Sequence, residues 1–201
     1  MYHGETKDNI ADRLGTLTCY AVSVPFLNAK RRKGMKKVAV LMGSDTDLPI
    51  VKKALDVLQE FAVPYEVHII SAHRTPSEAM AFSTSARAND FGVIIAAAGM
   101  SAHLAGVLAA NTTLPVIGVP IACGSMGGMD ALLSTVQMPT GVPVATVAVN
   151  GAANAALLCI QILAVTDTAL ADMLQKKRAE DHARVLSKNM AVEQEFNKTN
   201  C

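Results

Sequence analysis

The chain has 201 residues, of which 51% are hydrophobic and 4% aromatic, and its formal net charge at neutral pH is +1. This length suits one domain with tails, and the near-zero charge gives no electrostatic reason to expect binding to nucleic acid or an anionic membrane. Charge is unevenly distributed, because the only Asp, Glu, Lys or Arg between Asp90 and Asp167 is Asp130. Such a segment is hard to solvate, so we expect it in the core and in contacts between subunits.

The beginning of the chain differs from the rest. In residues 1–34 a basic cluster follows the apolar residues, which is the wrong order for a secretory signal, and MKKVAVLMGS from Met35 resembles a natural protein start. We expect residues 1–34 to be an N-terminal extension of unknown role, either disordered or a start-site artefact. The α/β domain that carries the candidate site is predicted over residues 35–166, and a C-terminal helix and tail over residues 167–201.

Strand-like and helix-like runs alternate from Lys37 onward. Apolar runs predict buried strands at residues 38–42, 65–70, 93–97, 116–119 and 144–149. Helical periodicity or capping signals predict helices from about 51, from Thr75, before Ala110, over 151–164, and from Asp167 to about Lys188. The helix over 151–164 is apolar on nearly every face, so we expect it to be buried all round, and we expect a frayed C-terminal end.

Repeated strand–helix alternation with short loops predicts right-handed crossovers and a parallel sheet. The predicted fold is therefore α/β, a three-layer flavodoxin-like (Rossmann-type) parallel sheet with helices on both faces, plus a C-terminal helix. In such sheets ligands bind beyond the carboxyl ends of the strands, where the strand order reverses. The candidate site should lie in the loops after the first three strands.

An apolar stretch over residues 91–110 is long enough to cross a bilayer. It is rich in Ala and Gly, contains His103 and is interrupted at Gly99, so we expect a buried segment of a soluble domain instead. Four cysteines have neither metal-ligand spacing nor a dense disulfide pattern, which predicts reduced thiols in a cytoplasmic protein. They are Cys19, Cys123, Cys159 and Cys201.

The loop after the first strand reads GSDTD, from Gly43 to Asp47. Ser44 offers a hydroxyl at a helix N-terminus, where free N–H groups attract anions, and the carboxylate of Asp47 can accept hydrogen bonds from a sugar diol. Ordinary helix capping by these residues is the alternative. The spacing matches neither a P-loop nor the GxGxxG fingerprint.

The loop after the second strand reads ISAHRTP and leads into a helix predicted to start with Thr75 as N-cap. Arg74 can make a forked contact with a phosphate, and Ser71 can add a hydroxyl. His73 can take and give protons near neutral pH; the neighbouring cation favours its neutral form, whereas a bound phosphate opposes that effect.

The loop after the third strand reads AAAGMSAHLAG, in which small residues around His103 let a flat ligand approach the backbone. His103 suits either a structural or a catalytic role at this helix start. His68 alternates within its strand and is predicted to be structural, and His3 and His182 lie in the extensions. Together the loops fit a small ligand with one phosphate, a ribose and a proton-transfer step, and they show no metal-ligand spacing.

These loops closely resemble those of the N5-carboxyaminoimidazole ribonucleotide mutases of purine biosynthesis, from about Val38 to Val165. The motifs that agree in order are VAVLMGSDTD, ISAHRTP, AGMSAHLAG, LPVIGVPI, GMDALLSTVQMPTGVPVAT and NAALLCIQILA. The family rearranges N5-carboxyaminoimidazole ribonucleotide to 4-carboxy-5-aminoimidazole ribonucleotide without cofactor or metal. Its proposed path is decarboxylation to aminoimidazole ribonucleotide and carbon dioxide, followed by recapture at C4.

The resemblance implies a role for each matching residue. His73 is implied as the catalytic proton carrier, acid for the departing carbamate and then base for the C4 proton. The implied substrate-binding residues are Ser44, Asp47, Ser71, Ala72, Arg74, Gly99, His103 and Leu104. The implied partners are a small phosphoribosyl substrate and further copies of the chain, since family members are typically octamers; neither nucleic acid nor a membrane is implied.

The chain departs from the family at its third loop, which is usually GGAAHLPG. In this loop, two small residues and the proline are replaced by Met100, Ser101 and Ala105, a change that could tighten or reorient the lid over the base. In addition, the AVNGAAN segment is shorter than usual in the family. A related branch carboxylates aminoimidazole ribonucleotide directly and usually has Arg-Ser-Asn where this chain has AHL. His103 and Leu104 therefore favour the mutase. A non-catalytic nucleotide-binding module is the alternative of another class, and it needs no proton carrier such as His73.

Overall fold

The computed structural model describes residues 34–197. The predictions for residues 1–33, for the last residues of the tail, and for His3, Cys19 and Cys201 lie outside this described part. Five strands form one sheet, namely β1 (Lys37–Met42), β2 (Tyr65–Ile69), β3 (Phe91–Gly99), β4 (Val116–Ile121) and β5 (Ala145–Thr146). All neighbouring strands are parallel, and their order is β2-β1-β3-β4-β5.

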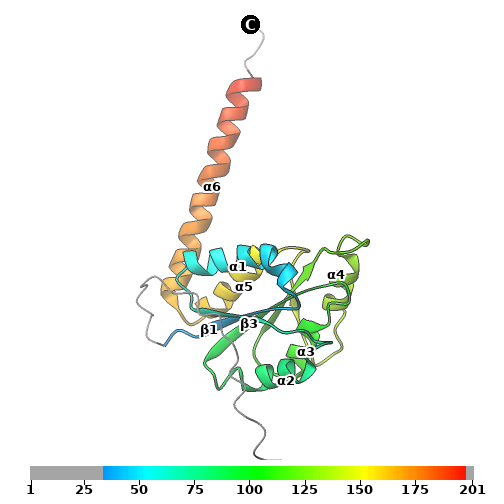
Figure 1. Cartoon of the computed structure of the whole chain (residues 1–201). Coiled ribbons are helices and arrows are strands. Elements are labelled where there is room, and N and C mark those ends of the chain that lie inside the picture. The colour runs from blue at the N-terminus through cyan, green and yellow to red at the C-terminus, as the bar shows by residue number, and fades with distance from the viewer. Residues whose placement is uncertain (1–33, 198–201) are drawn as a thin grey trace, which may run out of the picture.

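Helices cover both faces of the sheet (Figure 1). They are α1 (Leu48–Glu60), α2 (Pro76–Ser85), α3 (Leu104–Ala110), α4 (Met129–Val136), α5 (Ala152–Ala164) and α6 (Thr168–Phe196), with a short 3-10 helix, η2 (Asp45–Asp47). Figure 1 shows α1 and α5 on one face and α2 and α3 on the other. The predicted three-layer flavodoxin-like fold with a C-terminal helix is confirmed.

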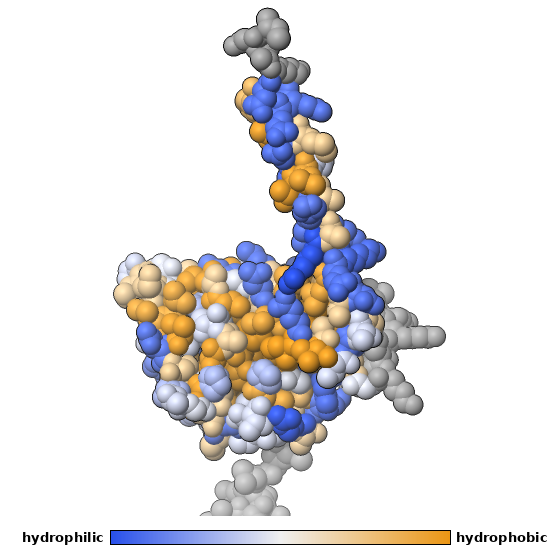
Figure 2. All heavy atoms as spheres, turned by 180° about the vertical axis from the view of Figure 1, so that it is seen from behind, coloured by the Kyte–Doolittle hydropathy of each residue, from blue (hydrophilic) through white to orange (hydrophobic). Residues whose placement is uncertain are grey.

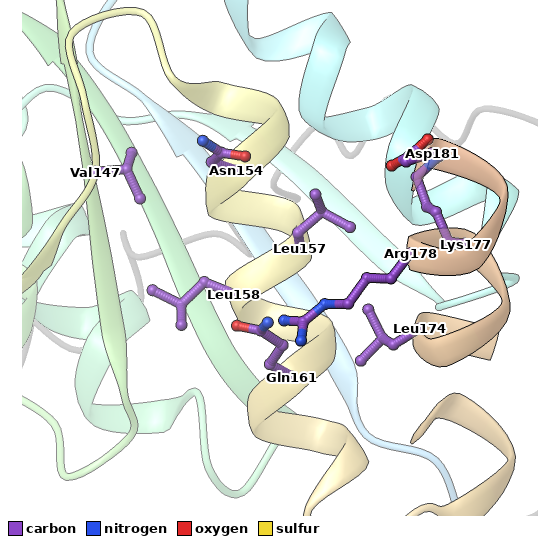
Figure 3. A pocket seen from close by; sticks show the side chains of 9 residues that line it. All are labelled: Val147, Asn154, Leu157, Leu158, Gln161, Leu174, Lys177, Arg178 and Asp181. Atoms are coloured by element: carbon purple, nitrogen blue, oxygen red, sulfur yellow. The ribbon is translucent and has the colours of Figure 1, made fainter. Parts of the chain in front are cut away.

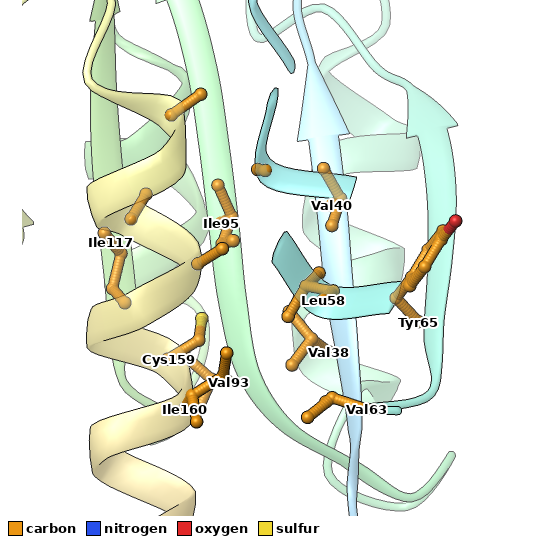
Figure 4. Close-up of a cluster of buried hydrophobic side chains, with 14 of the residues drawn as sticks. Val38, Val40, Leu58, Val63, Tyr65, Val93, Ile95, Ile117, Cys159 and Ile160 are labelled. Carbon is orange, nitrogen blue, oxygen red and sulfur yellow. The ribbon is translucent and has the colours of Figure 1, made fainter. Parts of the chain in front are cut away.

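Alternating side chains of the central strands form the two halves of the core. Val38 and Val40 of β1 face α1 and α5, where they pack with Leu58 and Ile160 (Figure 4). Ala39 and Leu41, which alternate with them along β1, face α2 and α3 and join the second cluster. Each such Leu, Ile or Val side chain contributes about 1.5–3 kcal/mol when it is fully buried. The strands are therefore fixed from both sides, and the loops at their carboxyl ends are held in place.

Two predicted elements differ from the structure near the end of the sheet. The strand predicted over 144–149 pairs only at Ala145 and Thr146. Val147 N still donates to Gly118 O, but the chain then turns at Asn150, which has a φ of +58° and whose N donates to Pro120 O. Helix α4 was not predicted at all. It begins after Gly128, which has a left-handed φ of +90°.

The helix predicted over 151–164 is not buried all round. Ala155, Ala156 and Cys159 are buried against the sheet, but Leu157 and Leu158 are only half-buried and Gln161 is exposed. Helix α5 thus covers the sheet with one side, and its other side forms part of the surface beside α6. Hydropathy alone could not distinguish these two sides, because both are rich in apolar residues.

Helix α6 starts as predicted, with the Asp167 side chain accepting from Leu170 N at 3.1 Å. It runs on to Phe196 instead of ending near Lys188, and it projects away from the body of the molecule (Figure 1). Its first turns pack on α5, and Lys177 Nζ lies 3.1 Å from Glu60 Oε1 of α1. No helix in residues 34–197 has the length and apolar character needed to cross a membrane.

His68 lies on β2 beside Phe82, with the two ring centres 5.0 Å apart. Its Nε2 is 3.6 Å from Glu66 Oε2 and makes no hydrogen bond. Burial lowers the pKa of His68, and the neighbouring Glu66 partly opposes this effect. These contacts place His68 in the packing between β2 and α2, away from the cavity described next.

Candidate active site

A cavity of about 650 Å³ opens at the carboxyl ends of the strands. The chain passes from β1 to β2 on one side and then returns to β3 on the other side of β1, so the strand order reverses between β1 and β3. Loops that follow these strands diverge there and leave an opening. The residues around it are Gly43, Ser44, Thr46, Asp47, Ser71, Ala72, His73, Arg74, Ala98, Gly99, Met100, Ser101, His103, Leu104 and Cys123.

All nine residues that the sequence singled out for the site, Ser44, Asp47, Ser71, Ala72, His73, Arg74, Gly99, His103 and Leu104, lie around this one cavity. Sequence reasoning did not assign Thr46 or Cys123 to it. Cys123 follows β4, whose loop has no charged or catalytic motif of its own. The only available signal was topological, because a fourth parallel strand delivers its loop to the same edge of the sheet.

The first loop was predicted either to bind a ligand or only to cap a helix, and the contacts of Ser44 and Asp47 differ in this respect. Ser44 Oγ accepts hydrogen bonds from Thr46 N and Thr46 Oγ1, at 3.3 and 2.9 Å, and so it caps the short helix η2. Asp47 occupies the N-cap position of α1, but its side chain makes no capping hydrogen bond. The capping alternative therefore accounts for Ser44 and leaves the Asp47 carboxylate without a capping role.

Asp47 is only 6% exposed although it lines the cavity. Burial raises the pKa of its carboxyl group, the nearby Asp45 adds to this increase, and a backbone hydrogen bond from Ser44 opposes it. A buried acid that lines a cavity is a frequent property of binding and catalytic sites.

The second loop is fixed by hydrogen bonds within its own turn. Thr75 stands at the predicted N-cap of α2 but does not cap it, because its hydroxyl accepts from Ser71 N at 2.9 Å and donates to Ser71 O at 3.0 Å. Ser71 Oγ in turn accepts from Arg74 N at 3.2 Å and from Arg74 Nε at 3.4 Å. Thr75 thus helps to shape the turn that carries His73.

The guanidinium of Arg74 connects the second loop to the first. Its Nη2 donates to Gly43 O at 3.0 Å, at the end of β1. A guanidinium has five N–H donors in a rigid fork, so these protein contacts leave others for a ligand. The observed bonds orient the fork beside the cavity.

His73 and His103, which both line the cavity, contact each other directly. His73 Nε2 lies 2.9 Å from His103 Nδ1, and the rings meet edge to face with centres 5.0 Å apart. A hydrogen bond at this distance needs a proton on one facing nitrogen and a lone pair on the other, and the tautomers of the two rings decide which nitrogen donates. His103 stands at the start of α3, yet its side chain makes no capping hydrogen bond. Because their ring nitrogens are within hydrogen-bonding distance, the two histidines can exchange one proton.

The third loop approaches the cavity with its backbone. A Cβ atom on Gly99 would lie 2.2 Å from Cys123 Sγ and 3.2 Å from Ile121 O, so the close passage of this backbone beside β4 favours glycine. The following turn is closed by Ala102 N donating to Met100 O at 2.9 Å and His103 N donating to Ser101 O at 2.8 Å. This turn sets the position from which α3 begins.

The cavity offers proton carriers, hydroxyls, a guanidinium and a carboxylate. Within residues 34–197, no group of three or more His, Cys, Asp or Glu side chains is arranged to hold a metal ion. The exposed Arg74 and the buried Asp47 can contact an anionic group and hydroxyl groups of one ligand, while the histidine pair moves a proton.

Comparison with known families agrees with the position of this cavity. Residues 37–184 match the family described as AIR carboxylase, which is most of the chain. The chain belongs to the AIR carboxylase family. The matched region includes all of the sheet and all of the residues around the cavity.

Two relatives named as mutases are similar to this chain over most of their length. A protein of Pyrococcus abyssi named N5-carboxyaminoimidazole ribonucleotide mutase is 52% identical over 147 residues, covering 73% of this chain and 84% of the relative. A protein of the same name from Thermotoga maritima is 45% identical over 160 residues, covering 80% and 94%. The crystal structure of Treponema denticola PurE has a TM-score of 0.72 and 26% identity, covering 78% of this chain and 98% of its own. The predicted resemblance to the mutase family is thus confirmed.

Replacing Asp47 by Asn should stabilise the protein at neutral pH, because the amide avoids the cost of burying a charge. The raised pKa of Asp47 means that the folded protein is penalised at pH values above that pKa, where the carboxyl is ionised. As the pH falls through the raised pKa, the folded protein takes up the proton first and the penalty disappears. We therefore expect Asp47→Asn to raise the Tm by a few degrees at neutral pH and by less near about pH 4.

Thermal unfolding followed by circular dichroism at both pH values tests this expectation. Asp56→Asn is the matched control, because Asp56 is an exposed carboxylate on α1 that does not line the cavity. An equal gain for both variants, or a gain for Asp47→Asn that grows on acidification, would contradict it.

Proposed function

We propose that this protein converts N5-carboxyaminoimidazole ribonucleotide to 4-carboxy-5-aminoimidazole ribonucleotide in purine biosynthesis. The observation that carries the proposal is the histidine pair, held at 2.9 Å between hydroxyls, a guanidinium and a buried carboxylate at the carboxyl edge of the sheet. Relatives named as mutases of this substrate are 45–52% identical and match over most of their length.

In this proposal each part of the substrate has a matching group. The phosphate binds Arg74, with the hydroxyls of Ser44 and Ser71 beside it, because the guanidinium fork and hydroxyl donors suit phosphate oxygens. The ribose diol donates to the Asp47 carboxylate, which no helix cap occupies. The imidazole ring lies against the backbone at Gly99, which lines the cavity.

The chemistry then requires two proton transfers. Cleavage of the bond between the exocyclic nitrogen and the carboxylate releases carbon dioxide, and this nitrogen receives a proton from His73. C4 of the ring then forms a bond to the same carbon dioxide, and the C4 proton passes to His73, which restores the starting protonation state. His103 orients His73 through the contact between Nε2 and Nδ1. Ala72 and Leu104 complete the walls around the ring.

Direct carboxylation of aminoimidazole ribonucleotide is the alternative within the family, and a nucleotide-binding module without activity is the alternative of another class. The relative from Vigna aconitifolia named phosphoribosylaminoimidazole carboxylase is 46% identical, but this chain covers 28% of it. Product formation should be measured from each of the two ribonucleotides, with and without bicarbonate. The mutase forms product from the carboxyamino substrate without added bicarbonate; a bicarbonate requirement supports the carboxylase, and no product from either substrate supports the binding module.

His73→Asn should retain substrate affinity and lower kcat by about two orders of magnitude or more, because the amide cannot carry the proton. Steady-state kinetics and calorimetric binding of substrate measure the two quantities separately. His182→Asn is the control, since His182 is exposed on α6 away from the cavity. Normal turnover by His73→Asn would refute the mechanism.

Arg74→Ala should raise KM about tenfold to a hundredfold while changing kcat less, because it removes charge-assisted hydrogen bonds to the phosphate. Arg87→Ala is the matched control: Arg87 donates to Thr113 O and Thr113 Oγ1 and does not line the cavity. An unchanged KM would remove Arg74 from the phosphate role.

We further propose that the chain assembles into a homo-octamer in the cytoplasm. Figure 2 shows apolar residues over much of the body beside α6. Between α5 and α6 lies a pocket of about 380 Å³ with Leu157, Leu158 and Leu174 in its walls, and Arg178 extends across it toward Gln161 (Figure 3). Exposed apolar side chains continue along α6 to Phe196, which is 71% exposed.

Two further features support contacts between copies. Helix α4 and the turn before it expose Met126, Met129, Leu133 and Val136, whose spacing places them along one side. The segment from Phe91 to Thr166 contains Asp130 as its single charged side chain, so the surface it forms is almost uncharged. Interfaces between subunits of homo-oligomers are typically depleted of charge in this way.

The free thiols of Cys123 and Cys159 support the proposed cytoplasmic location, because thiols stay reduced in that compartment.

The molar mass in solution tests the assembly, and light scattering after gel filtration should give eight chains. Leu186→Glu should shift the population toward smaller species, because it places a charge on the exposed apolar surface of α6. Lys188→Glu is the control, an exposed residue of the same helix whose change removes no apolar surface. A monomeric wild-type chain would refute the octamer, and equal masses for all three proteins would exclude this part of α6 from the interface.

A further inference from the structure

Met100 differs from every other residue around the active-site cavity. Its side chain is 62% exposed, and among the described lining residues it is the only large apolar side chain that is not buried. The other large apolar lining residue, Leu104, is 1% exposed and belongs to the wall. Met100 therefore lies at the rim, where solvent meets the cavity.

The backbone places Met100 there at a conformational cost. Its φ is +53°, in the left-handed region that a glycine adopts freely and that disfavours a side chain. Hydrogen bonds from Ala102 N to Met100 O and from His103 N to Ser101 O close the turn at 2.9 and 2.8 Å. His103 contacts His73, and only Ser101 and Ala102 separate it from Met100, so the rim is linked to the histidine pair by a short stretch of chain.

The Met100 side chain can change its rotamer while the backbone of the turn keeps its conformation. Methionine is unbranched, with three rotatable bonds and a soft thioether, so it adapts its shape to an irregular surface. When a ligand fills the cavity, an exposed thioether at the rim gains by covering the flat face of the aromatic imidazole ring and leaving water. Such movement needs no change in the backbone of the loop.

The proposed reaction has a step for which a cover of this kind matters. Carbon dioxide is uncharged, so the guanidinium and hydroxyls of the cavity hold it weakly, and the cavity is open to solvent beside His73 and His103. Escape leaves aminoimidazole ribonucleotide as a dead-end product. Retention then depends on closing the opening for the time between C–N cleavage and C–C formation.

We propose that Met100 closes the mouth of the cavity over the bound substrate and retains carbon dioxide until C4 recaptures it. This inference rests on the proposed function and adds a residue to it that neither binds the phosphate nor transfers a proton. The bonds broken and formed are those of the proposed reaction, and Met100 forms none of them.

Isotope retention tests the proposal directly. Substrate labelled with ¹³C in its carboxyl group is converted in excess unlabelled bicarbonate, and mass spectrometry at early conversion gives the fraction of product that keeps the label. This fraction reports escape relative to recapture and does not depend on the turnover rate. A blank without protein corrects for decarboxylation in solution.

Three variants separate the side chain from the strained backbone. Met100→Gly and Met100→Ala remove the cover, and both should lose label several-fold more than the wild type. Met100→Leu keeps an apolar side chain of similar volume and should retain label as the wild type does. The glycine variant relieves the left-handed φ, so its folding is not at risk.

Each outcome decides the question. Equal label retention by the wild type and both truncations would overturn the proposal, as would loss of label from Met100→Leu equal to that from Met100→Gly. Loss from the glycine variant alone would assign the effect to backbone conformation and would also overturn it. A wild-type protein that forms no product refutes the proposed function itself, which distinguishes the two failures.

Discussion

The parallel direction of all five strands is the constraint on which the site depends. Each strand delivers the loop that follows it to the same edge of the sheet, and the reversal of order between β1 and β3 opens a space between those loops. Residues from four separate stretches, after β1, β2, β3 and β4, therefore meet around one cavity. The two core clusters hold the strands from both faces and so keep the loop origins fixed. Core packing and site geometry are consequences of the same topology.

Hydrogen bonds between protein groups order the turn at Ser71 before a ligand binds. The Thr75 hydroxyl binds both backbone groups of Ser71, and Ser71 Oγ receives two donors of Arg74. The guanidinium then reaches Gly43 O on the neighbouring loop. Groups that are already ordered lose less conformational entropy on binding, so part of the affinity resides in residues that never contact the ligand.

The sheet and the three loops could be predicted from sequence because their signals are local. Continuous apolar runs mark strands that are buried on both faces, and the small and polar residues after Met42 and Ile69 mark loops. Contacts between distant residues had no such signal. The pairing of His73 with His103 joins two loops across the site, and Cys123 enters only because β4 ends at the same edge.

Other features could not be predicted, because a hydrophobic residue does not indicate which element will pack against it. The two sides of α5 have similar composition, yet one packs on the sheet and the other borders the surface pocket beside α6. Local preference also failed at Thr75, whose sequence context matches a helix cap although its hydroxyl binds back into the turn. At α5 tertiary contacts decided between the alternatives, whereas at Thr75 a hydrogen bond within the same turn did so; the local sequence permits both alternatives in each case.

If the proposed assembly covers α6, the folding of the outer half of this helix depends on the protein concentration. Every described residue from His182 to Asn197 is exposed, so the outer half of this helix receives little support from its own chain. An unsupported helix of this length is only marginally stable in water. If copies of the chain cover it, its helical content should increase with concentration, and no single free energy of unfolding will describe the molecule. Dilution would then unwind the outer half of α6 before it disturbs the sheet.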